Sequence, residues 1–179
     1  MQGTVRLETE RLVLRRHILE DAHILYLCFG RDEKMYEYSG WNPYATEEMA
    51  LETVQHFLES YSDTHFYGWA IEYEGQLVGT IGAYDYDPKS SSIEIGISIA
   101  RNSWGKGFAS EAMQRVLVYL TEDEGITTVT AWCAENNIGS RRAMEKAGML
   151  QTSIENNALM INDKVFGKLN FEYHANLAS

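Results

Sequence analysis

A glycine-rich turn between a predicted strand and a predicted helix constrains the fold of this chain more than any other stretch. Residues 92–100 alternate apolar with polar or small side chains, which is the period of a β-strand. From residue 109 to residue 120 the apolar side chains recur at helical spacing, with good helix formers between them. The turn that joins the two elements reads Trp104-Gly105-Lys106-Gly107-Phe108. Its glycines are therefore expected directly before the N-terminus of a helix.

This position predicts a binding site for phosphate groups. The first turn of a helix leaves backbone N–H groups without intrahelical partners, and the helix dipole adds positive potential there. Gly105, Gly107 and the small Ala109 would let a ligand come close to the backbone, and Lys106 adds a cation. The pattern predicts a pyrophosphate site, and the alternative is a turn that only packs against its neighbours.

Two better-known phosphate loops do not fit these residues. A Walker loop requires Ser or Thr after its lysine, whereas Lys106 is followed by Gly107. A dinucleotide-binding fingerprint requires Gly or Ala where Ser110 stands, and it opens a parallel βαβ unit. The segments before this turn instead predict an antiparallel meander, so both alternatives are set aside.

The turn resembles the acyl-CoA signature of the GNAT superfamily of N-acetyltransferases, which is written Gln/Arg-x-x-Gly-x-Gly/Ala. Gly107 and Ala109 occupy the last two fixed positions, whereas Trp104 stands where Gln or Arg is usual. With this departure, residues 104–112 are similar to the branch that contains the ribosomal-protein N-terminal acetyltransferases (RimJ/RimL-like).

Two further segments extend the resemblance over nearly the whole chain. Residues 137–149 are similar to the family's Asn-x-x-Ser helix, which ends in Glu-Lys-x-Gly-Phe. Residues 7–15 match its opening segment. Together the three matches run from Leu7 to about Phe171.

The resemblance implies the α/β (α+β) fold of the acyl-CoA N-acyltransferases. This fold has a mixed central sheet of about seven strands flanked by helices, with a V-shaped splay between the fourth and fifth strands. The length of 179 residues independently predicts one domain, residues 1–179, with a core that needs no metal or disulfide. Periodicity and turn signals predict strands at 11–16, 66–73, 76–86, 93–100, 127–133, 150–160 and 164–173, and helices at 19–30, 46–61, 109–120 and from 137 onward.

Acetyl-CoA is the expected co-substrate, and the resemblance places it in the gap between strands 94–100 and 127–133. The main chain at Ile97 and Ile99 would pair with the pantetheine amides, as a strand edge does. The second motif would add Asn137, Ser140 and Arg142, although Asn137 is also explained as a helix cap. The pyrophosphate would be held by Trp104, Gly105, Lys106, Gly107, Phe108, Ala109 and Ser110.

Acyl transfer to an amine requires a neutral amine and benefits from a proton donor for the departing thiolate. Glu94, on the strand beside the thioester, is the candidate base, and a structural glutamate is the alternative. Many family members use a Tyr seven residues after the Asn as the acid, but Met144 occupies that position. The resemblance then assigns the acid role to Ser140, with CoA binding or helix capping as alternatives. The reserve candidates are Tyr84, Asp85 and Tyr86.

The expected reaction is direct attack of the amine on the thioester in a ternary complex. Cys133 is not expected to be a nucleophile, because it has no evident His partner and falls in a predicted strand. The missing tyrosine also leaves a second function open, a noncatalytic acyl-CoA-binding or regulatory module of the same fold.

The aromatic segment of residues 35–44 contains turn formers and shows no clear period. The family shapes its acceptor site in this region, so Tyr38 and Trp41 are candidate acceptor contacts together with Tyr84 and Glu94. The alternative is a buried loop that covers the core. The acceptor is a primary amine, and a protein N-terminus, an amino acid, a polyamine and an aminoglycoside all remain open.

Composition limits the other partners. The net charge of −11 opposes binding of nucleic acid and also of CoA, so local cations at Arg101, Lys106, Arg141 and Arg142 are expected to compensate. The five histidines lack metal-ligand spacing, and no metal is expected. Without a signal segment or a membrane-length apolar run, the chain is expected in the cytoplasm with no membrane partner. The resemblance leaves a homodimer through the C-terminal strands open.

Overall fold

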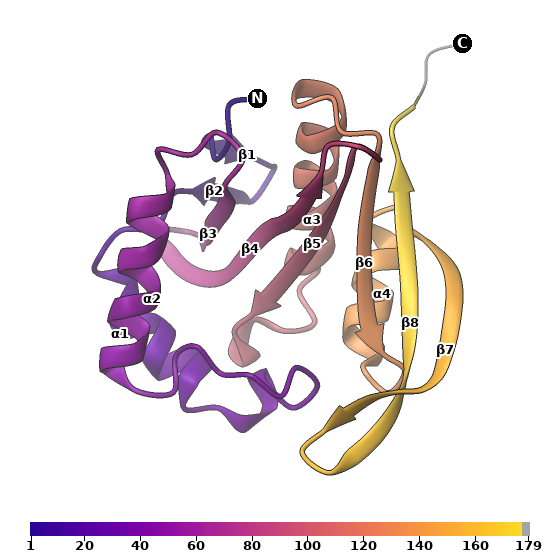
Figure 1. Ribbon diagram of the computed structural model, residues 1–179. Coiled ribbons are helices and arrows are strands. Elements are labelled where there is room, and N and C mark those ends of the chain that lie inside the picture. Colours follow the sequence, from indigo (N-terminus) through magenta and orange to yellow (C-terminus); the bar gives the residue numbers. More distant parts are fainter. Residues whose placement is uncertain (177–179) are drawn as a thin grey trace.

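A mixed sheet of eight strands forms the centre of the computed structural model, which describes residues 1–176 (Figure 1). The strand order is β1-β2-β3-β4-β5-β6-β8-β7, and β5 with β6 is the parallel pair among otherwise antiparallel neighbours. The strands are β1 (Leu7–Glu8), β2 (Leu12–Arg15), β3 (Tyr67–Tyr73), β4 (Gln76–Asp87), β5 (Ser92–Ile99), β6 (Thr128–Ala134), β7 (Leu150–Ile161) and β8 (Lys164–His174). The sheet has one strand more than the seven that periodicity predicted, because the two residues of β1 are too few to show a period.

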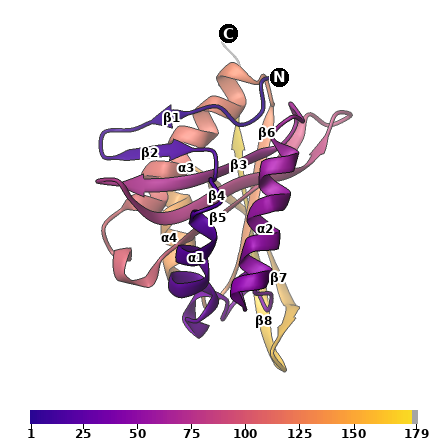
Figure 2. The ribbon, with the colours of Figure 1, turned by 90° about the vertical axis from the view of Figure 1, so that its left-hand side faces the viewer.

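Helices cover both faces of this sheet, with α1 and α2 on one face and α3 and α4 on the other (Figures 1 and 2). The α-helices are α1 (Asp21–Leu25), α2 (Glu47–Ser60), α3 (Phe108–Val118) and α4 (Ile138–Lys146). Wider helical turns continue α1 as η1 (Tyr26–Gly30) and α3 as η4 (Tyr119–Asp123), and short 3-10 turns form η2 (Glu33–Met35) and η3 (Arg101–Ser103). Thr46 is the N-cap of α2, since its hydroxyl accepts a hydrogen bond from the Met49 amide.

Two apolar cores hold the layers together. The larger core lies between the sheet and the α3/α4 layer and contains Trp69, Phe108 and Phe171, each almost fully buried. The smaller core joins the sheet to α1 and α2 through Leu25 and Val54, which have no exposed surface. Full burial of one such side chain is worth roughly 1.5–3 kcal/mol. The two cores therefore fix both helical layers against the strands.

The parallel pair β5/β6 is joined over only a short length. Pairing covers Ser92–Thr128, Ile93–Val129 and Glu94–Thr130, after which the two strands diverge (Figure 1). β5 continues to Ile99 and β6 to Ala134 without a partner on the facing side. This is the V-shaped arrangement that the resemblance implies, and it opens the interior of the sheet between two strand edges.

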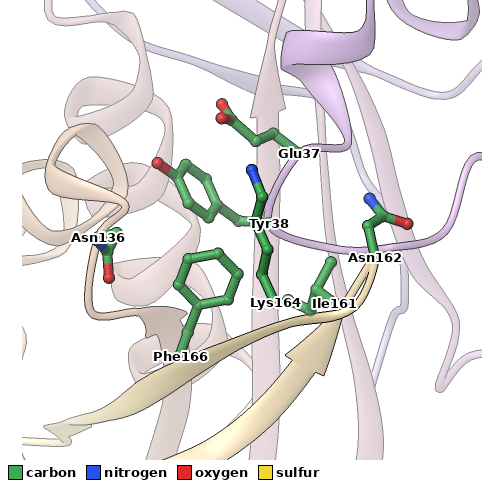
Figure 3. Close-up of a pocket in the computed structure, with 7 residues that line it drawn as sticks. All are labelled: Glu37, Tyr38, Asn136, Ile161, Asn162, Lys164 and Phe166. Atoms are coloured by element: carbon green, nitrogen blue, oxygen red, sulfur yellow. The ribbon is translucent and has the colours of Figure 1, made fainter.

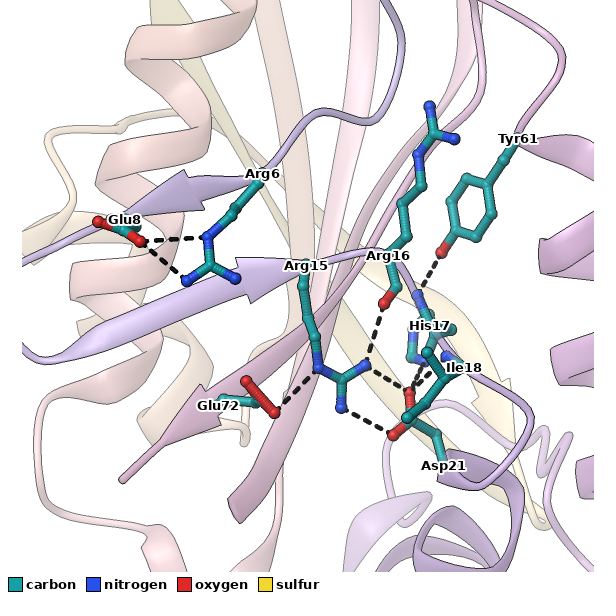
Figure 4. A network of polar contacts seen from close by, with 9 residues as sticks. All are labelled: Arg6, Glu8, Arg15, Arg16, His17, Ile18, Asp21, Tyr61 and Glu72. Atoms are coloured by element: carbon teal, nitrogen blue, oxygen red, sulfur yellow. Dashed lines mark hydrogen bonds and ion pairs between the residues drawn. The ribbon is translucent and has the colours of Figure 1, made fainter. Parts of the chain in front are cut away.

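A buried polar network fixes α1 against the start of the sheet (Figure 4). Arg15 on β2 donates to both carboxylate oxygens of Asp21 at 2.8 and 2.9 Å, and its Nε lies 2.9 Å from Glu72 on β3. The Ile18 amide donates to Asp21 at 3.0 Å, and His17 Nδ1 lies 3.3 Å from the same carboxylate. Burial alone would raise the pKa of Asp21, but the hydrogen bonds from these partners hold it well below its usual range.

Replacement of Asp21 should therefore reduce stability in a pH-dependent way. A carboxyl group with a lowered pKa in the folded state stabilises the protein above its unfolded pKa of about 3.9, and this contribution is lost as the pH falls through and below that value. We expect Asp21→Asn to lower the free energy of unfolding at pH 7 by about 1.5–3 kcal/mol, the range for hydrogen bonds to charged groups. Urea unfolding at pH 7 and at pH 3 measures the difference in unfolding free energy between Asp21→Asn and the unchanged protein. This difference should be smaller at pH 3.

Glu8 offers a matched control because it also pairs with an arginine, Arg6 at 2.9 Å, but its side chain is 64% exposed (Figure 4). Glu8→Gln should change the unfolding free energy by less than about 0.5 kcal/mol. An Asp21→Asn protein as stable as Glu8→Gln at pH 7 would contradict the role assigned to the network.

Candidate functional site

A groove of about 850 Å³ occupies the space where β5 and β6 diverge. Its walls are the facing halves of the two strands, and its ends are formed by the turn before α3 and the start of α4. The segment around Met35 and Tyr38 closes it on the side of α1 and α2. The groove therefore joins a free strand edge to two helix N-termini.

The glycine-rich turn adopts the geometry expected of an anion-binding loop. Gly105 and Gly107 have left-handed backbone angles, φ 75° and 79°, and Gly107 is the N-cap of α3. The first intrahelical hydrogen bond runs from the Glu111 amide to the Gly107 carbonyl, so the amides of residues 108–110 precede it. A Cβ placed on Gly105 would have no atom within 4 Å. The turn thus leaves open space beside unpaired amide groups.

The turn is held in place from two sides. The indole N–H of Trp104 donates to the Ile99 carbonyl at 2.6 Å, which ties the turn to the end of β5. On the other side, Glu111 in the first turn of α3 accepts from Arg11 Nε at 2.9 Å and from the Thr9 hydroxyl at 2.7 Å. The Arg11 guanidinium lies 4.8 Å from the centroid of the Phe108 ring. These contacts of Thr9 and Arg11 were not predicted from the sequence, because a pairing across a hundred residues leaves no local pattern.

Glu94 lies in the groove beside Tyr84 of the neighbouring strand. The two residues face each other in the β4/β5 ladder, and the Tyr84 hydroxyl donates to the Glu94 carboxylate at 3.4 Å. Burial and the negative charge of Glu94 raise the pKa of Tyr84 to about 12, so its phenol is protonated at neutral pH. A Cβ on Gly96 would lie 2.9 Å from the Tyr84 hydroxyl, so the glycine lets this ring lie close across β5.

Most of the predicted site residues line this one groove, but Lys106, Trp41 and the reserve candidates Asp85 and Tyr86 do not. The Nζ of Lys106 lies 6.0 Å from the centroid of the Phe108 ring, and Trp41 is 72% exposed. The predicted residues that line it are Tyr38, Tyr84, Glu94, Ile97, Ile99, Trp104, Gly105, Gly107, Phe108, Ala109, Ser110, Asn137, Ser140 and Arg142.

Of the predicted compensating cations, Arg101 and Arg142 line the groove and Arg141 does not. Arg101 pairs with Asp32 at 3.2 Å, and Arg141 pairs with Glu145 at 3.0 Å along α4. Sequence reasoning missed several other lining residues: Lys34, Met35, Ser98, Trp132, Asn136 and Lys146.

A family model for the acetyltransferase (GNAT) domain matches residues 11–150. The chain belongs to the GNAT family of acetyltransferases. YoaA of Bacillus subtilis, an uncharacterized N-acetyltransferase, is 32% identical to it over 150 residues, which cover 83% of this chain and 84% of YoaA.

Solved structures share the GNAT fold at low sequence identity. RimL, a ribosomal alpha-N-protein acetyltransferase in complex with coenzyme A, superposes with a TM-score of 0.87 at 14% identity, over 97% of this chain and all of that chain. MccE, a microcin self immunity acetyltransferase in complex with acetyl-CoA and AMP, gives a TM-score of 0.82 at 15% identity, over 93% of each chain. The expected fold is therefore confirmed.

The second GNAT motif forms the start of α4. Asn137 is the N-cap of α4, and its side-chain oxygen accepts a hydrogen bond from the Ser140 amide at 3.2 Å. This is the helix-capping role that the sequence analysis gave as an alternative to CoA binding. Ser140 lines the groove from the first turn. Met144, at the position where many GNAT enzymes carry a tyrosine, is buried, with 2% of its surface exposed.

The part of the chain that the structure describes has no helix long and apolar enough to span a membrane. Within residues 1–176 there is also no group of three His, Cys, Asp or Glu side chains placed to hold a metal ion.

Cys133 lies on β6 in the wall of the groove, with 3% of its surface exposed. Burial raises the pKa of its thiol to about 11, and the nearby positive charge of Arg141 offsets only part of this shift. The reactive thiolate is therefore scarce at neutral pH.

We accordingly expect slow alkylation of Cys133 by iodoacetamide near pH 7. The rate should keep rising about tenfold per pH unit to a plateau near pH 11, because the thiolate fraction sets the rate. Mass spectrometry on a Cys28→Ser variant isolates this thiol, since Cys28 is the other free cysteine. A plateau below pH 9 would show a thiolate that the structure does not account for.

Proposed function

We propose that this protein binds acetyl-CoA in the groove and transfers the acetyl group to a primary amine by direct attack in a ternary complex. The observation that carries the proposal is the continuity of the groove, in which an unpaired strand edge leads to the glycine-rich N-terminus of α3. The complexes of RimL with coenzyme A and of MccE with acetyl-CoA support it.

The residues of the groove fit the parts of an acyl-CoA. The backbone of β5 at Ile97 and Ile99, beyond the last pair with β6, would hydrogen-bond the pantetheine amides. The turn of residues 104–110 would hold the pyrophosphate through its open amides. At the start of α4, Asn137, Ser140 and Arg142 would complete the site, with Arg142 supplying positive charge that the acidic chain otherwise lacks.

The proposed chemistry uses Glu94 as the base. Glu94 takes a proton from the acceptor ammonium, the free amine attacks the thioester carbonyl, the C–N bond forms and the C–S bond breaks. Ser140 gives its proton to the departing thiolate, and its oxygen takes the second proton that the nitrogen loses as the amide forms. The protonated phenol of Tyr84 holds the Glu94 carboxylate in position. The raised pKa of the Cys133 thiol agrees with a reaction that forms no acetyl-cysteine.

The acceptor would enter from the side of Tyr38 and Tyr84, and it is either a protein N-terminus or a small amine. Trp41 lies outside the groove and would contact only a large acceptor. Release of free thiol from acetyl-CoA, measured with a panel of amines and N-terminal peptides, tests the activity. Tight CoA binding without thiol release across the panel would favour a noncatalytic acyl-CoA-binding module.

A cytoplasmic location and a homodimer through the C-terminal strands complete the proposal. The two cysteines are free thiols, which suits a reducing compartment. β7 is the outer strand of the sheet on that side, and it exposes Leu150, Ile154 and Met160. Sedimentation measurements distinguish monomer from dimer.

Gly107→Val should nearly abolish CoA binding, because a β-branched side chain at φ 79° strains the turn and crowds the proposed pyrophosphate site. Lys106→Ala should weaken binding less, because Lys106 lies outside the groove and can supply no more than one charge-assisted contact, worth roughly 1.5–3 kcal/mol. Calorimetric titration with CoA measures both effects.

Gly125→Val is the matched control for backbone strain, since Gly125 also has a positive φ, 74°, and open space around it but lies away from the groove. It should bind CoA like the unchanged protein. Equal CoA affinity in folded Gly107→Val and Gly125→Val proteins would remove the basis for the assigned pyrophosphate site.

Glu94→Gln should lower kcat by about 10² to 10⁴-fold and leave acetyl-CoA affinity almost unchanged, because the loss belongs to the chemical step. The defect should shrink as the pH rises, since more of the acceptor is then already neutral. Steady-state kinetics across pH, with Ser140→Ala and Tyr84→Phe measured in parallel, separate the three roles. An unchanged rate for Glu94→Gln at neutral pH would show that Glu94 is not the base and that it does no more than position the acceptor amine.

A further inference from the structure

A second cavity of about 260 Å³ adjoins the groove at the tip of the β7/β8 hairpin (Figure 3). It shares Glu37, Tyr38 and Asn136 with the groove, so the two spaces meet along these residues. The hairpin supplies the remaining wall, formed by Ile161, Asn162, Lys164 and Phe166. An acceptor whose amine lies in the groove could therefore extend into this cavity.

The walls of this cavity are held together by specific contacts. The Tyr38 and Phe166 rings meet edge to face, with centroids 5.6 Å apart. Next to them, Gly40 comes so close to the hairpin that a Cβ there would lie 3.2 Å from Ile161 Cγ2. Ile161 is buried, although most of the hairpin around it is exposed. The cavity is thus a built feature in which the segment before α2 packs on the hairpin.

The charges in this cavity are unequal. The Glu37 carboxylate is compensated, because Lys34 Nζ lies 3.3 Å from both of its oxygens. Among residues 1–176, the ammonium of Lys164 has no carboxylate within ion-pair distance, and the adjacent Asp163 does not line the cavity. Figure 3 shows the Lys164 side chain extending from the hairpin alongside Tyr38, on the side of Glu37. In a chain of net charge −11, this cavity therefore presents an uncompensated positive group.

The neighbouring groups suit an anion as well. The side-chain amides of Asn136 and Asn162 can each donate two hydrogen bonds, and both residues line the cavity. An ammonium flanked by amide donors and aromatic edges favours a carboxylate over a second ammonium.

We propose that the acceptor amine carries a carboxylate group, which Lys164 binds in this second cavity. Lys164 is then a specificity-determining residue that selects acidic amines. The inference rests on the proposed acetyl transfer and deepens it, because it names the class of acceptor.

Matched acceptors that differ only in one carboxylate test the inference. Alanine and alaninamide, compared at equal concentrations of the neutral amine, form one pair, and the dipeptide amides Ala-Glu-NH₂ and Ala-Gln-NH₂ form the other, so that the pairs distinguish a free amino acid from a peptide N-terminus. In at least one pair, the acidic member should have a kcat/KM higher by about tenfold or more, expressed mainly in KM, as expected for a charge-assisted contact.

The Lys164 variants then connect this preference to the cavity. Lys164→Met should remove it, Lys164→Arg should retain it, and Lys164→Glu should reverse it. Lys89→Met and Lys89→Glu are charge-matched controls, because Lys89 is exposed in the turn between β4 and β5 and lines neither cavity. Both controls should keep the selectivity of the unchanged protein.

Three outcomes would overturn the inference: equal reactivity within both pairs, a preference that survives in Lys164→Met, or a stronger preference for the diamine putrescine that is lost in Glu37→Gln. Each of these outcomes is a comparison of measurable rates. The proposed acetyl transfer would then remain supported, and only the inference about Lys164 would fail. Absence of thiol release with every acceptor would instead remove the proposed function and the inference together.

Discussion

β5 and β6 share only three residue pairs, and every part of the candidate site depends on what happens beyond them. After Glu94 and Thr130 the strands diverge, and each presents backbone N–H and C=O groups to the space between them. Such groups are costly when they are buried without partners. The divergence is therefore compatible with a stable fold only because the space is an open groove, where water or a ligand can satisfy them. The strand edge that could bind a ligand exists because β5 and β6 do not pair beyond these three positions.

The second requirement is a rigid helix start at one end of that groove. Gly105 and Gly107 turn the chain out of β5 and into α3, and Trp104 binds the turn back to the Ile99 carbonyl. Glu111 is held by Thr9 and Arg11 from the first residues of the chain. These contacts bring the opening segment and the central turn, which are distant in sequence, together in the fold. The opening segment positions the helix whose N-terminus is the proposed anion site.

Electrostatics divides the groove into regions of different character. Glu94 and the protonated phenol of Tyr84 lie near the point where the strands separate, which is a suitable place for proton transfer. Arg142 lines the same groove and supplies local positive charge in an acidic chain, whereas the charge of Arg101 is paired with Asp32. Lys164 lies apart from them on the β7/β8 hairpin. Cofactor binding, chemistry and acceptor selection can thus be assigned to different residues, which is why they can be tested separately.

Local pattern alone was enough to predict seven of the eight strands, the four α-helices and the glycine turn, because each depends on periodicity or on backbone angles that few residues adopt. Glu94, Tyr84 and Ser140, which the sequence suggested for one site, line one groove in the structure. Tertiary structure decided the rest. Packing between distant segments sets the ion pair of Arg11 with Glu111, the position of Lys106 outside the groove lining and the exposure of Trp41. The same is true of the cavity between Tyr38 and Lys164, because charge and space at that point exist only once the hairpin meets the segment before α2.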